Sequence, residues 1–128
     1  MASQAASSIE VSASPERVWA LISNVNRYPD LFFPVDRMVE VPEGSMAVGY
    51  SYREFGGIPP FKSDSEWQVT VFEPYRRQVH VGDDGKMTIE ITFDLEATPA
   101  GTRLAHAATL TPRWFTAPLN IVLWPLLM

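Results

Sequence analysis

Cysteine is absent from this 128-residue chain, and basic residues are scarce. Without a thiol, the chain cannot form a disulfide, a thiolate metal site or a cysteine nucleophile. Ten Lys and Arg residues against 15 Asp and Glu give a net charge of −5, so the chain has no basic face for the phosphates of nucleic acids or anionic membranes. Two histidines and no clustered acidic pair argue against a zinc site, and we expect no metal and no cofactor.

Catalytic motifs with a fixed spacing are also missing. The sequence contains no Gly-x-Ser-x-Gly elbow, no glycine-rich phosphate loop and no His-Glu-x-x-His helix. Residues 1–8 lack the basic and apolar runs of a signal peptide, and we expect them to form a flexible tail before a single domain over 9–128. With no apolar run long enough for an integral membrane span, we predict a cytoplasmic protein.

The residues that are present suit one globular domain. At 14.3 kDa, with 46% hydrophobic and 12% aromatic residues, the chain can build one hydrophobic core. Alternating apolar and polar residues predict an opening strand over 9–13, followed by a short helix that Ser14 caps and Pro15 begins. We expect a second short helix over 31–33. Turn signals then separate six strands, over 35–41, 48–55, 65–72, 77–81, 87–97 and 102–110.

The strand over 87–97 has the clearest pattern, with apolar residues at every second position from Met87 to Leu95. Before it, Asp83-Asp84-Gly85 has the composition of a hairpin turn. After the last strand, Thr111 can cap a helix and Pro112 fits a first helical turn. We therefore expect a terminal helix to begin there.

Several segments resemble those of a known superfamily. They are Ala13-Ser14-Pro15-Glu16-Arg17-Val18-Trp19, Asn26-Arg27-Tyr28-Pro29, Glu73-Pro74-Tyr75-Arg76-Arg77 and Gly101-Thr102-Arg103-Leu104. The chain is thereby similar, over roughly residues 9–112, to the START-like superfamily called SRPBCC, which includes polyketide cyclase/dehydrase-like proteins and lipid carriers. The resemblance implies an α+β helix-grip fold. In that fold a curved antiparallel sheet of about seven strands, with two short helices after the first strand, wraps a C-terminal helix around a cavity.

The end of the chain departs from the family pattern. No charged residue follows Arg113, and Pro118 and Pro125 interrupt an almost wholly apolar segment over 114–128. A helix that rests on a sheet should keep a solvated outer face. The segment therefore favours a helix that is incomplete within this chain. The alternative is burial against a second copy, giving a homodimer, or against a membrane surface.

Strand alternation predicts which side chains line the cavity. His106 would face inward as the one titratable group there, whereas Glu54 would be solvated and His80 exposed. A lone histidine on an apolar face is more often a core residue than a functional one, and the tyrosines could equally fill the sheet face. The predicted ligand-binding residues are Tyr50, Tyr52, Trp67, Met87, Ile89, Ile91, Phe93 and His106.

A loop with paired glycines and paired prolines is the candidate gate. The SRPBCC superfamily also includes plant hormone receptors, and the resemblance to them implies that such a hairpin tip closes over ligand. A plain turn is the alternative. The predicted gate residues are Gly56, Gly57, Pro59 and Pro60, with Phe32 and Phe33 at the mouth.

We predict binding or transport of a hydrophobic small molecule, such as a lipid, an isoprenoid or a polyketide-like aromatic. One alternative is a cyclase or dehydratase, with Glu54 or His106 as general acid or base and Tyr50 or Tyr52 polarising a carbonyl. Another is a co-chaperone-like module that binds a protein partner.

Overall fold

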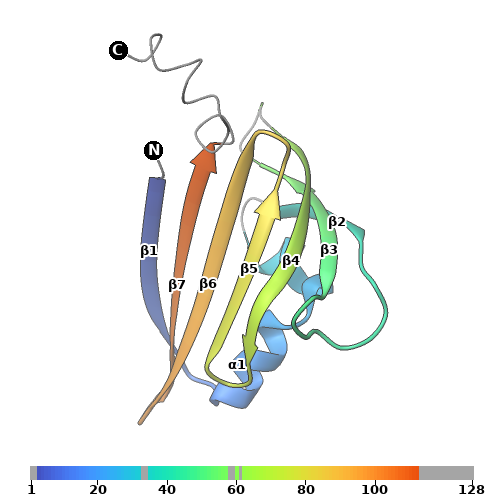
Figure 1. The fold of residues 1–128 in the computed structure, drawn as a ribbon. Helices are drawn as coiled ribbons and strands as arrows, with labels where there is room; N and C mark the ends of the chain where they lie inside the picture. Colours follow the sequence, from blue (N-terminus) through green and yellow to red (C-terminus); the bar gives the residue numbers. More distant parts are fainter. Residues whose placement is uncertain (1–2, 33–34, 58–59, 61, 113–128) are drawn as a thin grey trace.

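The protein is an α+β fold built on one antiparallel sheet (Figure 1). The computed structural model describes residues 3–32, 35–57, 60 and 62–112. Its seven strands lie in the order β1-β7-β6-β5-β4-β3-β2. Their bounds are Ser3–Val11, Val35–Glu40, Ser51–Gly56, Ser63–Glu73, Arg77–Asp83, Met87–Thr98 and Gly101–Pro112 for β1 to β7. Between β1 and β2 lie α1 (Pro15–Ile22), the 3-10 turn η1 (Val25–Arg27) and α2 (Tyr28–Leu31).

Helix α1 begins where the sequence predicts. The Ser14 hydroxyl accepts a hydrogen bond from the backbone N–H of Arg17 at 3.3 Å, and Pro15 occupies the first turn. The helix buries Val18, Trp19 and Ile22 against the sheet. We call the face of the sheet that α1 covers the concave face.

Cross-strand pairing defines rows of residues on the concave face, since directly opposed residues point to the same side. One row runs through Tyr52, Trp67, Gly82 and Ile89 on β3, β4, β5 and β6. Phe93 and Leu95, further along β6, are buried against α1. The concave face is thus filled at its α1 end.

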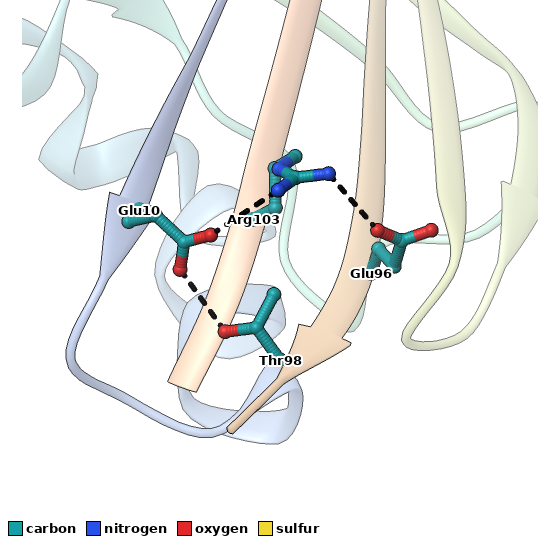
Figure 2. Close-up of polar contacts among 4 residues, drawn as sticks. All are labelled: Glu10, Glu96, Thr98 and Arg103. Carbon is teal, nitrogen blue, oxygen red and sulfur yellow. Dashed lines mark hydrogen bonds and ion pairs between the residues drawn. The ribbon is translucent and has the colours of Figure 1, made fainter. Parts of the chain in front are cut away.

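The opposite face of the sheet carries charged side chains in contact with water (Figure 2). Arg103 on β7 lies between two carboxylates, 3.6 Å from Glu10 on β1 and 3.3 Å from Glu96 on β6. The Thr98 hydroxyl donates to Glu10 at 3.0 Å. These charged side chains are at least half exposed, so this network marks the outer surface.

Three sequence-based boundaries were wrong. Strand β1 begins at Ser3 rather than residue 9, because Ser3–Ser8 pair with β7 although they lack the branched residues typical of strands. Residues 3–8 are therefore not a tail. Strand β7 continues to Pro112, which pairs with Met87, so no helix begins at Thr111. The second helix, expected over 31–33, is α2, which begins at Tyr28 and ends at Leu31.

Candidate functional site

A chain of hydrogen bonds crosses the buried end of the concave face. The Tyr52 hydroxyl lies 2.7 Å from His80 Nδ1, and His80 Nε2 lies 2.8 Å from Gln78 Oε1. The Gln78 amide nitrogen then donates to the Ser23 hydroxyl, just past α1, at 2.7 Å. Tyr52, His80 and Gln78 are at most 3% exposed, and each polar atom named here has a partner.

The protonation state of His80 fixes the direction of this chain. Burial lowers the pKa of His80 to about 4, so the ring is neutral at physiological pH. The Gln78 carbonyl oxygen can only accept, so the single N–H of His80 is on Nε2. His80 Nδ1 is therefore an acceptor, and the Tyr52 O–H donates to it.

The other tyrosines in this region also donate to protein acceptors. The Tyr28 hydroxyl donates to the Ile22 carbonyl, and the Tyr50 hydroxyl donates to the Pro42 carbonyl at 3.1 Å. Burial raises the pKa of both Tyr28 and Tyr52, so these phenols stay protonated. None of the three has an O–H left to polarise a carbonyl.

Trp67 lies flat against β5, because its neighbour there is glycine. A Cβ atom placed on Gly82 would come within 2.4 Å of the Trp67 ring, so only glycine leaves room for it. The indole N–H donates to the Ser65 hydroxyl at 2.8 Å. The ring also stacks on Tyr52, with 6.3 Å between centroids.

Glu54 is a buried carboxyl group without a partner among the described residues. Its side chain is on the same face as Tyr52, directly across from Ser65 on β4 and Met38 on β2. It is 9% exposed, and burial raises its pKa to about 7. In the described part of the chain, every fully enclosed side-chain oxygen has a hydrogen-bond partner. The Glu54 oxygens have no such partner, so they are not fully enclosed and reach open space. We call Glu54, Ser65 and Trp67 the polar corner.

An apolar surface lies beside the polar corner. Ile89 is next to Gly82 in the register, and Ile91 is next to His80. Both isoleucines, and Met87, stay half-buried after the described strands and helices have packed, whereas Phe93 is 4% exposed. The surface formed by Ile89, Ile91 and their neighbours on β7 can therefore accept further apolar atoms.

The structure corrects three predictions about titratable residues. His80 is buried, and Glu54 is buried rather than solvated. His106 pairs with Phe93 and so shares its face, but it is exposed and lies 3.3 Å from the Ser7 hydroxyl. Among the described residues, the titratable groups buried at the concave face are therefore His80, Glu54 and Tyr52 from the sheet and Tyr28 from α2, not His106. The sequence signal that could have indicated this is the polar pair Gln78 and His80 at alternate positions of a short strand.

The predicted gate is described in part. Gly56 ends β3, Gly57 has a φ of 125°, and Pro60 is exposed in a turn. Phe32 packs against the buried residues around Tyr28 and also against those around Phe93, with its ring 5.7 Å from that of Phe93. The remaining gate positions, 33 and 59, lie outside the described residues, as does the apolar segment over 114–128.

A separate cleft of about 640 Å³ opens beside α1 and not over Ile89. It is lined by Trp19 and Phe72, by the η1 region, and by the loop after β2. Of the predicted ligand-binding residues only Tyr50 borders it, whereas Ser23 links it to the hydrogen-bond chain. Volume alone would place the ligand in this cleft. We favour the apolar surface, because it adjoins Glu54, the one carboxyl group that is buried among the residues the structure describes.

Within the described ranges, no three His, Asp or Glu side chains could together hold a metal ion. None of the helices there is long and apolar enough to cross a membrane.

Comparison with known proteins adds a family and a set of similar folds. The family described as polyketide cyclase / dehydrase and lipid transport matches residues 3–123. The Zhui aromatase/cyclase from a Streptomyces species is 16% identical, over 88% of this chain and 70% of its own, with a TM-score of 0.71. A Rhodobacter sphaeroides protein is 25% identical over 82% of this chain and 70% of its own, with a TM-score of 0.63. The di-domain ARO/CYC protein BexL is 14% identical over 90% of this chain and 38% of its own, with a TM-score of 0.69. Among curated proteins, none matches.

Proposed function

Because the chain belongs to the polyketide cyclase/dehydrase and lipid transport family, we propose that it binds a hydrophobic small molecule against the concave face of its sheet. The observation that supports this is the half-buried apolar surface at Ile89 and Ile91, next to the polar corner. Burial of apolar ligand atoms there contributes about 25 cal/mol per Å² of surface removed from water. Trp67 is 4% exposed and so belongs to the core beneath this surface, whereas the polar groups of the polar corner orient the ligand.

Binding of Nile red, a neutral apolar dye, tests this proposal. Ile91→Trp should weaken binding by at least about tenfold, because the larger side chain occupies the space that the dye would fill. Thr92→Trp is the matched control, since it adds the same indole one residue along β6, on the other face. Equal affinity in a folded Ile91→Trp protein would place the ligand elsewhere, with the cleft beside α1 as the next candidate.

Catalysis of the cyclase or dehydratase type is the second candidate function, and the pKa of Glu54 favours it. A carboxyl group with a pKa of about 7 can both take and give a proton at neutral pH. The tyrosines argue against the rest of such a site, because the hydroxyls of Tyr50 and Tyr52 already donate to protein acceptors. Turnover with a bell-shaped pH profile, lost in Glu54→Gln, would favour catalysis over binding.

The aromatase/cyclase names among the similar folds suggest a polyketide-like aromatic ligand. The predicted homodimer through residues 114–128 and the cytoplasmic location stay predictions, to be checked by light scattering and by fractionation.

A further inference from the structure

The polar corner has more acceptors than donors. The Trp67 indole N–H already donates to the Ser65 hydroxyl, and the Tyr52 hydroxyl already donates to His80. The Tyr28 hydroxyl donates to the Ile22 carbonyl. Two groups at this point of the concave face can still form hydrogen bonds to a ligand. They are the Glu54 carboxyl group and the hydroxyl hydrogen of Ser65, the residue directly across from Glu54.

No basic side chain balances Glu54 in the described part of the chain. Every Lys and Arg there is exposed or half-buried. The basic residues on the neighbouring strand β2 and on β3 itself have partners of their own: Arg37 stacks on Phe55 at 4.7 Å, and Arg53 lies 3.7 Å from Asp64. An anionic ligand at the polar corner would therefore meet a carboxylate and no compensating positive charge.

We propose that Glu54 determines ligand specificity, selecting a neutral aromatic molecule that presents a hydroxyl group and rejecting a carboxylate of the same shape. This inference rests on the proposed binding function. A hydroxyl group matches the polar corner, because it can donate to Glu54 and accept from Ser65 at the same time. A ligand carbonyl would leave the carboxylate without a donor, and leaving a buried charged group unpaired costs affinity.

The selectivity should depend on pH through Glu54. The titratable groups that face it are Tyr28 from α2 and Tyr52 from its own strand, both of which stay protonated in the neutral range. The residues across from it on β2 and β4, Met38 and Ser65, do not titrate. Glu54 is therefore the group that changes charge near neutral pH, because its pKa lies at about 7.

Naphthol and naphthoate form a probe pair that shares one aromatic ring system and differs in the polar group. Affinities are measured by quenching of tryptophan emission at about pH 8 and about pH 6, where naphthol stays neutral and naphthoate stays anionic. Any apolar site disfavours a carboxylate to some extent. The contribution of Glu54 to the preference for naphthol over naphthoate is the part of that preference that disappears in Glu54→Gln. Glu66→Gln, which removes an exposed carboxylate on the other face of β4, is the matched control.

We expect the preference of the wild type for naphthol to be at least about tenfold larger at pH 8 than at pH 6. Glu54→Gln should show the smaller preference at both pH values, and Glu66→Gln should behave as the wild type. A preference that changes neither with pH nor in Glu54→Gln would overturn the inference. If Glu54→Gln does not fold, the pH series on the wild type decides. Failure of the wild type to bind either probe or Nile red would instead count against the proposed function.

Discussion

The two buried titratable groups should affect stability in opposite directions as the pH changes. In the unfolded chain His80 binds a proton below about pH 6.5, but in the folded protein only below about pH 4. Protonation therefore favours the unfolded state, and the contribution of His80 to stability falls as the pH drops through this window. Glu54 holds its proton up to about pH 7 when folded and up to about pH 4.5 when unfolded. Its contribution falls as the pH rises.

The size of each effect follows from its pKa shift. One pKa unit corresponds to about 1.4 kcal/mol, so each group changes the free energy of unfolding by about 3 kcal/mol across its window. The windows overlap between about pH 4.5 and 6.5, where the two slopes cancel. Each contribution is visible only when the other group is replaced.

Urea unfolding of the wild type, Glu54→Gln and His80→Gln at several pH values between about 4.5 and 7.5 measures both terms. Relative to the wild type, Glu54→Gln should gain about 3 kcal/mol as the pH rises, and His80→Gln should gain a similar amount as it falls. Either change moves the urea midpoint by about 1 M or more. Glu66→Gln, at an exposed position, should show neither slope. Differences that are flat with pH, or that have the same sign in both variants, would refute the assignment of these two groups as buried.

Substitutions at three further positions test the packing of Trp67, the cap of α1 and the ion pairs of Arg103. Gly82→Ala should displace the Trp67 ring and destabilise the protein by about 1–3 kcal/mol, which shifts both the tryptophan emission and the urea midpoint. An unchanged emission spectrum would contradict the close approach of the Trp67 ring to Gly82. Ser14→Ala should cost about 1 kcal/mol through loss of the α1 cap, whereas Ser14→Asp should restore most of it; equal stability of all three would mean that the cap contributes nothing. Arg103→Gln should cost less than about 1 kcal/mol, because its ion pairs are exposed, and a loss of several kcal/mol in thermal unfolding would show a larger structural role.

The sequence predicted in part which residues share the concave face. Trp67, Ile89 and Ile91 follow from strand alternation and lie on the concave face as expected. Glu54 was recognised as a candidate group, but its burial was missed because its position near a strand end is typical of solvated residues. His80 was missed because its polar neighbours indicated an exposed face.

A register irregularity in β4 further limited what alternation could predict. Strict alternation along this strand would place Trp67, Val69 and Val71 on one face. The bulge between Val69 and Val71 leaves Thr70 without a directly opposed residue in the β4–β5 register, and it brings Phe72 against the core. Such an irregularity depends on the partner strand, so the strand's own residues do not reveal it.

Local chemistry in the sequence by itself determined the order of elements, the start of α1, the apolar face of β6 and the hairpin turn before it. These features depend on residues a few positions apart, whose capping, turn and side-chain preferences are intrinsic. The tertiary structure alone decided that Ser3–Ser8 form a strand, that Glu54 is buried, and that His80 joins Tyr52 and Gln78. The partners of these groups are far apart in the chain: 28 residues separate Tyr52 from His80, and 55 separate Ser23 from Gln78. Which polar groups lose water and which find a partner is fixed only when β7 pairs with β1 and α1 packs on the sheet.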